Sequence, residues 1–343
     1  MRIYINGIGL ISPQETHDNS QFLNKVVELT QDFFPINEPV YKDYIKPRDL
    51  RRMGKLIRHG IIAGKIAMAD AKLSMPEAII TGTGLGCATD TEKFLIKMVE
   101  NKESLLTPTA FIQSTHNTLG GSIAIGLSCN NYNMTYVQRG LSFEAAILDA
   151  QLMLQSGEIR NALVGGFDEM TDYQLRLLLS TDFYSKSSGV KAGQASGFFV
   201  FELENTENTY AELLALETVY NPKNVIESIS KKIESLINKY HLNAKNTVIL
   251  MGYNGYNKET NVYNQVTKLF FSNYLITHFK HLCGEYFTAS AFSFWLANQI
   301  LKKQTVPHTL LYNKITIAKE IENVLIFNQF QGKQHSLILL GKC

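Results

Sequence analysis

The chain has few cysteines and little net charge, and each shortage excludes a class of protein. Its four cysteines, Cys87, Cys129, Cys283 and Cys343, show neither CxxC nor zinc-ligand spacing. The sequence therefore predicts no disulfide framework and no cysteine metal site, and it favours a reducing, cytoplasmic setting. A net charge of +2 in 343 residues gives no reason to expect a nucleic acid partner.

Long apolar runs are also missing, and so is a secretion signal. The apolar stretches fall well short of the ~18 residues that span a bilayer, so we expect no membrane span. The first residues, MRIYINGIGLISP, predict a strand instead of the charged and then apolar pattern of a signal peptide. We expect a soluble intracellular protein.

Strand-like and helical segments alternate along most of the chain. Hydrophobic residues make up 45% and charged residues 19%, which indicates a folded protein with a large core. Strands are expected at 3–11 and 78–83, and one amphipathic helix at 49–72. A polar connection after Glu204 separates two series of similar α/β character. We therefore expect two pseudo-repeated halves, residues 1–205 and 206–343, although no repeat recurs at a fixed period.

Residues 134–149, MTYVQRGLSFEAAILD, predict a strand, a tight turn at Arg139 and Gly140, and a helix. Many acyl-transfer enzymes place their nucleophile in such a setting. A thiol there would lie at a helix N-terminus, where backbone N–H groups lower its pKa. This stretch has no cysteine, and it lacks the G-x-S-x-G pattern of a serine elbow. The sequence therefore predicts the turn that holds a nucleophile in such enzymes, but without a nucleophilic residue in it.

Several motifs, in order, resemble the β-ketoacyl synthases of the thiolase fold. INGIGLISP resembles the first strand and GTGLG an early turn, and PTAFIQSTHNTLGGSIAIGLSC resembles the segment before the nucleophile strand. FEAAILDAQLMLQSGEIRNALVGG follows the family pattern without a gap, and GVKAGQASGFFVFELE resembles the close of the first half. The resemblance implies an α/β, thiolase-like fold of five layers, αβαβα, with a degenerate nucleophile elbow in residues 1–205 and degenerate histidine motifs in residues 206–343.

The resemblance also assigns the catalytic positions. Counted back from Gly165, the family cysteine falls on Gly140, Asn254 stands for the first histidine and Glu285 for the second, while the family lysine is retained as Lys280. Glycine cannot hold an acyl chain as a thioester. The histidines stabilise the thioester oxygen through hydrogen bonds, and an ionised Glu285 would repel a developing enolate.

Loss at all three positions implies a non-condensing subunit like the family's chain-length factors. Such a subunit pairs with a catalytic ketosynthase as a heterodimer, in type II fatty-acid, polyketide or aryl-polyene synthesis. The resemblance implies no bound cofactor, because substrate arrives on the phosphopantetheine of an acyl carrier protein. Many chain-length factors carry glutamine at the cysteine position, and a small shift in the turn would bring Gln138 there. The alternative for Gln138 is an ordinary polar residue at a strand end.

Other residues leave alternatives open. Cys129 or Cys283 could be a displaced nucleophile in an active synthase or acyltransferase, with Cys283 the better candidate, or both could be buried small residues. His278 and His281 could replace a lost histidine, or they could be ordinary polar residues. His116 is given no role. A further alternative is a non-catalytic homodimer that binds acyl chains.

Two further features follow from the resemblance. Phe330 matches the family's gating phenylalanine, but Gln329 and Gln331 flank it and only Gly332 remains of the flexible glycines, so Phe330 is either a gate or a wall of the substrate tunnel. A basic cluster near the early helix is either a solvated helix face or a docking surface for an acidic carrier protein. The cluster assigned to docking comprises Arg48, Arg51, Arg52, Lys55 and Arg58.

Overall fold

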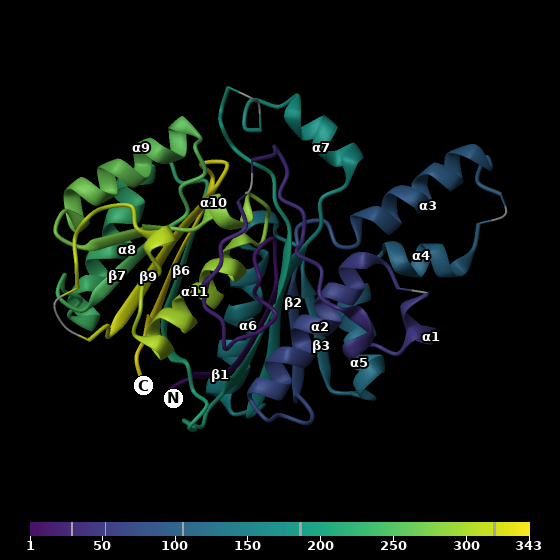
Figure 1. Cartoon of the computed structure of the whole chain (residues 1–343), viewed down its shortest axis with the longest axis horizontal. Helices are drawn as coiled ribbons and strands as arrows, with labels where there is room; N and C mark the ends of the chain where they lie inside the picture. The colour runs from purple at the N-terminus through teal and green to yellow at the C-terminus, as the bar shows by residue number, and fades with distance from the viewer. Residues whose placement is uncertain (29, 52, 105, 185–186, 318–319) are drawn as a thin grey trace.

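A ten-stranded sheet runs through the molecule in the order β3-β2-β4-β5-β1-β6-β10-β9-β7-β8 (Figure 1). The structure is a computed structural model that describes residues 1–343 except 29, 52, 105, 185–186 and 318–319. The strands are β1 (Tyr4–Ile11), β2 (Ala78–Gly82), β3 (Tyr132–Tyr136), β4 (Asn161–Asp168), β5 (Ala195–Glu202), β6 (Ala211–Tyr220), β7 (Thr247–Met251), β8 (Leu275–His278), β9 (Asn323–Phe330) and β10 (Gln334–Gly341).

The two halves of the sheet repeat one topology. In the first half β2 pairs in parallel with β3 and β4, and antiparallel pairing continues through β5 to β1. In the second half β7 pairs in parallel with β8 and β9, and antiparallel pairing continues through β10 to β6. A short β1–β6 ladder, Tyr4 with Glu212 and Ile5 with Ala211, joins the halves. The predicted pseudo-duplication is therefore present in the strand order.

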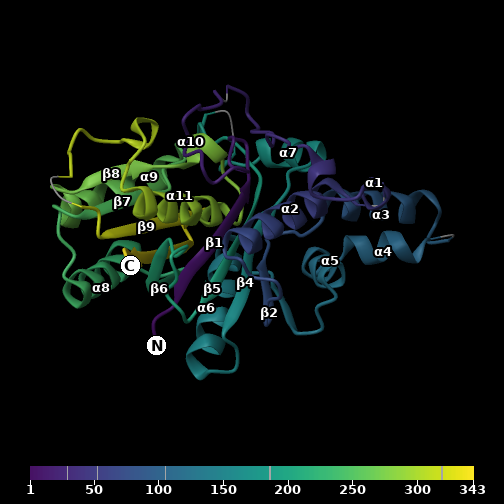
Figure 2. The same ribbon diagram turned by 60° about the horizontal axis from the view of Figure 1, so that its bottom comes forward.

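Helices complete a five-layer αβαβα arrangement (Figures 1 and 2). One outer layer contains α2 against β1 and β5, the central layer contains α6 and α11, and the other outer layer contains α8 and α9. The α-helices are α1 (Pro47–Leu50), α2 (Lys55–Asp70), α3 (Ala88–Glu100), α4 (Pro108–Ser114), α5 (Thr118–Leu127), α6 (Ser142–Ser156), α7 (Asp172–Leu179), α8 (Val225–Tyr240), α9 (Asn257–Val266), α10 (Lys280–Cys283) and α11 (Ala289–Lys303). Short helical turns are η1 (Tyr41–Asp43), η2 (Arg139–Leu141), η3 (Thr267–Phe271, of π type) and η4 (His308–Leu310). The thiolase-like fold expected from the sequence is confirmed.

The core centres on α11, in which every residue from Ala289 to Leu301 is buried. The helix packs on strands of both halves of the sheet. Its Phe294 contacts Phe199 and Phe201 of β5 at ring-centroid distances of 4.8 and 5.8 Å. On the opposite face of the first half, β1 lies unusually close to α2. A Cβ atom on Gly9 would lie 2.1 Å from the carbonyl oxygen of Ala63, so only glycine permits this approach.

The single helix expected at 49–72 is wrong. The structure has α1 and α2 with a break before Lys55, where Gly54 adopts an extended conformation. A Cβ atom on Gly54 would lie 2.5 Å from an oxygen of Asp90 in α3. Glycine is a poor helix former, and close contact with another helix fixes it in this break.

In the described part of the chain, no helix has the length and apolar character needed to cross a bilayer.

Candidate functional site

The turn that follows β3 leads through η2 into α6 and contains Gln138, Arg139 and Gly140. Arg139 has a φ of 56°, in the left-handed region that costs a side-chain-bearing residue about 1 kcal/mol or more. Ser142 fixes the turn: its hydroxyl oxygen accepts the Gln138 N–H at 2.8 Å and lies 2.8 Å from the carbonyl oxygens of both Thr83 and Arg139. The strand–turn–helix predicted from the sequence is present.

Gly140 has no space for a side chain. A Cβ atom there would lie 2.5 Å from Cβ and 2.8 Å from Cγ of Phe330, and 2.9 Å from Oε1 of Gln334. Gln334 holds the turn from the opposite side, because its Oε1 accepts the Gly140 N–H at 2.8 Å and its Nε2 donates to the Gln138 carbonyl at 2.9 Å. Phe330 and Gln334 therefore occupy the volume that a nucleophilic side chain would need.

Gln138 begins the turn, two residues before Gly140. Its side chain is exposed, and it lines a separate hollow of about 190 Å³ between β3, α6 and β6. Its backbone groups are used within the turn, by Ser142 and Gln334.

Phe330 is the last residue of β9 and pairs in register with Gln334 of β10. The hairpin turn that follows has positive φ at Gln331 (54°) and Gly332 (64°). The Phe330 ring is buried against Phe183 and Phe287, with ring-centroid distances of 5.8 and 4.9 Å. The backbone of Phe330 is thus held by sheet pairing and a tight turn.

Two hollows meet at Phe330. The first, of about 150 Å³, is mainly apolar and includes Leu177 and Leu178 of α7. The second, of about 330 Å³, includes Arg139 and Lys333. Phe330 therefore forms a wall between an apolar hollow and a polar one.

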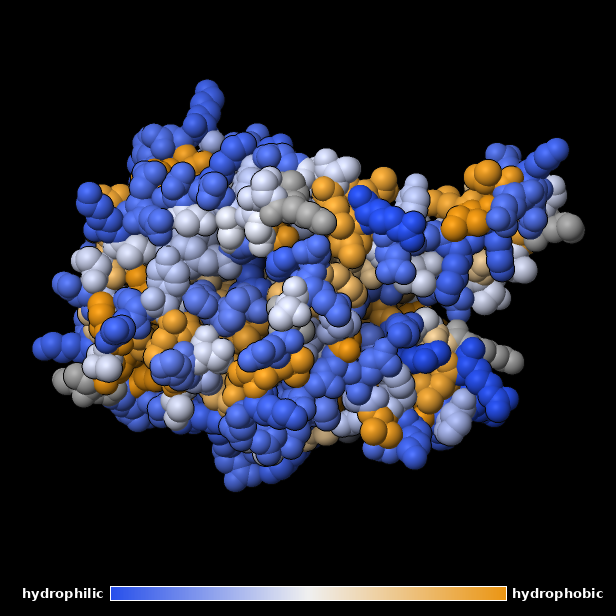
Figure 3. Space-filling model, turned by 45° about the horizontal axis from the view of Figure 1, so that its top comes forward, coloured by the Kyte–Doolittle hydropathy of each residue, from blue (hydrophilic) through white to orange (hydrophobic). Residues whose placement is uncertain are grey.

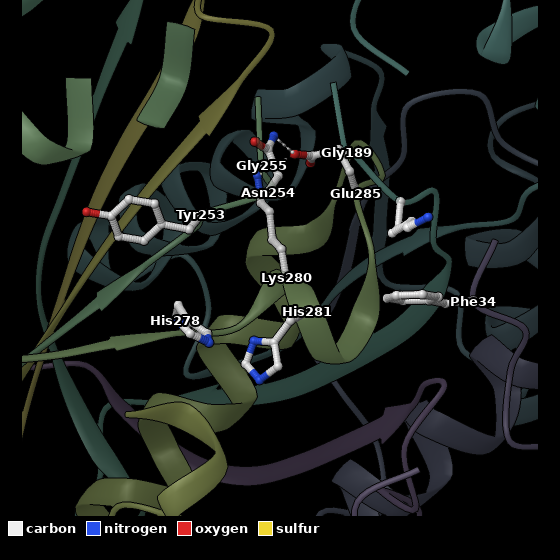
Figure 4. Close-up of a pocket in the computed structure, with 10 residues that line it drawn as sticks. Phe34, Gly189, Tyr253, Asn254, Gly255, His278, Lys280, His281 and Glu285 are labelled. Atoms are coloured by element: carbon white, nitrogen blue, oxygen red, sulfur yellow. Dashed lines mark hydrogen bonds and ion pairs between the residues drawn. The ribbon is translucent and has the colours of Figure 1, made fainter. Parts of the chain in front are cut away.

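Asn254, Lys280 and Glu285, which the sequence assigned to the site in the second half, lie together (Figure 4). Lys280 Nζ donates to Glu285 Oε2 at 2.7 Å and to the Gln329 carbonyl at 2.9 Å. Asn254 Nδ2 donates to Glu285 Oε2 at 2.6 Å and to Glu259 Oε2 at 2.7 Å. Both amide protons of Asn254 are thus taken by carboxylates, so this residue cannot also donate to a thioester oxygen.

Glu259 was missed by the sequence analysis, although it completes this cluster. It is fully buried at the start of α9 and accepts the Gly332 N–H at 2.8 Å, which links the cluster to the Phe330 hairpin. Burial raises the pKa of Glu259. Burial also raises the pKa of Glu285 to about 7, against the opposing effect of the Lys280 ammonium. Two buried carboxylates around one ammonium favour retention of a proton near neutral pH.

Asn254, Lys280 and Glu285 line a hollow of about 310 Å³ (Figure 4). Lys280 lies between the Asn254–Glu285 pair and two histidines, His278 and His281, whose ring centroids are 4.1 Å apart. His281 Nε2 lies 3.0 Å from the Thr309 carbonyl oxygen. Burial lowers the pKa of His278, which favours its neutral imidazole. Among the described residues, no three of His, Cys, Asp or Glu gather in a way that could hold a metal ion.

The two cysteines considered as displaced nucleophiles are both buried. The Cys283 Sγ lies 3.3 Å from the carbonyl oxygen of Gly284, and burial raises the pKa of its thiol well above the ordinary value. The residues that line the 310 Å³ hollow do not include Cys283. Cys129 is also buried, with its Sγ 3.5 Å from the Pro76 carbonyl oxygen. His116 packs beside Gly86.

The basic cluster is only partly available to a partner. Lys55 pairs with Glu38 at 2.8 Å, and Arg58 donates to the Leu50 and Met53 carbonyls. Arg48 and Arg51 are exposed, and Arg48 lies 3.5 Å from Asp49. Arg52 lies outside the described residues.

Comparisons with solved structures show the same fold over the whole chain. A type II polyketide synthase acyl-carrier protein in complex with its ketosynthase matches with a TM-score of 0.79 at 15% identity, covering 100% of this chain and 99% of that chain. The ishigamide ketosynthase/chain length factor matches at 0.76 and 17% identity, with coverages of 100% and 99%. A ketosynthase in complex with its chain length factor from Xenorhabdus doucetiae matches at 0.73 and 15%, with coverages of 100% and 98%.

No curated protein matches the sequence, but a family model does. The family model for the β-ketoacyl synthase N-terminal domain matches residues 14–200, which is more than half of the chain and includes the turn at Gly140. The chain therefore belongs to the β-ketoacyl synthase family.

Proposed function

We propose that this protein is a non-condensing partner subunit, similar to a chain-length factor, of an active β-ketoacyl-ACP synthase in type II fatty-acid, polyketide or aryl-polyene synthesis. The filled space at Gly140 carries the proposal. Condensation needs a nucleophile that holds the acyl chain, and Phe330 and Gln334 exclude a side chain at that position. The second half adds support, because the side-chain amide of Asn254 donates its hydrogen bonds to the carboxylates of Glu259 and Glu285.

The free edge of the sheet supports a partner subunit. Among the described strands β3 pairs only with β2, and it exposes Tyr132 (36%) and Met134 (40%). Leu148 and Leu152 of α6 are exposed nearby, and they line the same hollow as Gln138. An unpaired strand with apolar side chains is a site where another chain can pair.

A second apolar surface lies on the arm formed by α3 and α4, which projects from the body (Figures 1 and 3). Leu95, Ile96 and Val99 of α3 are exposed there, and with Tyr173 of α7 they line a groove of about 550 Å³. Together with the β3 edge, this surface supports burial of this side of the molecule against a partner. The exposed Arg48 and Arg51 support, more weakly, a role in steering an acidic acyl carrier protein.

Co-expression with a β-ketoacyl synthase from the same organism that retains the catalytic cysteine and both histidines tests the pairing. We expect a stoichiometric complex on size-exclusion chromatography, and Met134→Asp should dissociate it by placing a charge on the β3 edge. Leu269→Asp is the matched control, because Leu269 is an exposed apolar residue in η3 of the second half. A homodimer without a copurifying ketosynthase would count against the proposal and for an acyl-binding homodimer.

Intact-mass spectrometry tests the absence of condensing chemistry. The purified chain, incubated with acyl-loaded carrier protein, should gain no acyl group on any of its four cysteines. The buried Cys283 has a raised thiol pKa, so it offers little thiolate for attack on a thioester. A stable acyl adduct on Cys283 would overturn the proposal in favour of an active enzyme with a displaced nucleophile.

A further inference from the structure

We infer that the hollow in front of Phe330 is a binding site for a small organic anion, a carboxylate or a phosphate ester, with Arg139 as its principal cation. The hollow has a volume of about 330 Å³ and lies directly beside the degenerate elbow. The inference depends only on this chain and does not need the partner proposed above.

The charges that line the hollow are all of one sign. Arg139 and Lys333 are its two ionisable cations, and the other lining residues are aromatic side chains and glutamines, with no carboxylate. No ion pair between described residues includes either cation. Two positive charges without an internal counter-ion, in a recess, attract an anion from solution.

Arg139 is held in place before any ligand arrives. Its Nη1 donates to the Gly84 carbonyl at 3.3 Å, and its Cζ lies 5.4 Å from the ring centroid of Phe287. A guanidinium has five N–H donors, and this contact uses one of them. The remaining donors can bind an oxyanion through two parallel hydrogen bonds, which is the geometry that arginine favours for carboxylate and phosphate.

The backbone holds this side chain in an uncommon conformation. Arg139 has a positive φ of 56°, which a glycine would adopt at lower cost. The chain nevertheless has arginine at this strained position and glycine at the next one. Strain of this kind persists where the rest of the structure holds it, and it concentrates at ligand sites.

The walls indicate what the anion is attached to. Phe287 and Phe330 form an apolar side of the hollow, and Tyr220 lies at its rim. The N-terminus of α6, a 15-residue helix, follows directly after the turn and adds a positive electrostatic potential. An anionic group attached to a short carbon chain fits both the cations and the aromatic wall better than a bare inorganic ion.

Isothermal titration of the full chain with sodium butyrate, sodium malonate and sodium phosphate, at constant ionic strength set with chloride, tests the site. We expect saturable binding of at least one anion, and Arg139→Gln should weaken it about tenfold or more, because a charge-assisted pair is lost. Lys333→Gln should weaken it less. The control is Lys97→Gln, which should leave binding unchanged, because Lys97 is an exposed lysine of α3 that forms no ion pair with another described residue.

A second variant separates binding from folding. Arg139→Gly removes the guanidinium and also relieves the positive φ, so it should abolish binding while the unfolding midpoint stays equal or rises. Binding of butyrate or malonate without phosphate assigns a carboxylate ligand, and binding of phosphate alone assigns a phosphate group. Either result supports an anion site, but only the first supports an attached carbon chain. Binding that Arg139→Gln leaves unchanged, or no saturable binding of any of the three anions, overturns the inference.

Discussion

Substitution of Gly140 by alanine should destabilise the protein, although it adds only one methyl group. The φ of Gly140 lies outside the left-handed region, so alanine causes no backbone strain there. The cost comes from the clash at 2.5 Å with Cβ of Phe330, an atom that cannot rotate away because β9 and β10 fix its backbone. Overpacking of this kind costs about 1–3 kcal/mol, and we expect the upper part of that range. Urea unfolding followed by circular dichroism measures it.

Two further variants sharpen this prediction. Gly121→Ala in α5 is the control, because a Cβ atom there meets nothing within 4 Å, and alanine should leave stability unchanged or raise it by up to about 1 kcal/mol. Phe330→Gly removes both of the carbons that clash, Cβ and Cγ. The double variant of Gly140 and Phe330 should therefore lose less stability than the two single losses added together, by about 1 kcal/mol or more. Additive losses, or a Gly140→Ala variant as stable as Gly121→Ala, would show that the elbow is not filled as described.

Three predictions concern buried ionisable groups. Lys280→Met leaves two buried carboxylates without their ammonium and should cost about 3–5 kcal/mol in urea unfolding, and adding Glu285→Gln should restore part of that loss. Burial raises the pKa of Glu285 from 4.5 to about 7. The stability that the protonated Glu285 contributes is therefore present below pH 4.5 and is lost as the pH rises through 7. In urea unfolding at pH 5 and pH 8, Glu285→Gln should gain stability relative to wild type at the higher pH. The pKa of His335 is lowered by burial from 6.5 to about 4, so wild type loses stability as the pH falls from 6.5 towards 4, and His335→Phe should lose less in the same acid titration.

The sequence predicted those elements of the structure that depend on residues near one another in the chain. Alternating apolar residues and a helical period specify the strand, turn and helix around Gly140, and the absence of cysteine can be read directly. The two halves were expected from their similar character, and strand pairing confirms the pseudo-repeat. The helix expected at 49–72 was wrong because the contact that favours its break, between Gly54 and Asp90, joins separate elements.

The contacts that decide what the elbow can do were not predictable in this way. Gln334 reaches Gly140 across 194 residues, and Glu259 meets Asn254 through a carboxylate that no motif marks. Phe330 was assigned to a gate or a tunnel wall, but nothing in its surroundings along the chain indicates that its Cβ faces Gly140. Such packing depends on where β9 and β10 lie relative to η2, and that is set by the whole sheet.

The buried helix α11 has a consequence for how this protein can be divided. It belongs to the second half of the chain, yet it packs on β1, β4 and β5 of the first half as well as on β9. A fragment that ends between the halves would leave the aromatic face of β5 in water, and the complementary fragment would expose α11 along its length. The two halves are repeats of topology that share one core. We therefore expect them to fold as one cooperative unit, and a split chain to regain structure only when both fragments are present.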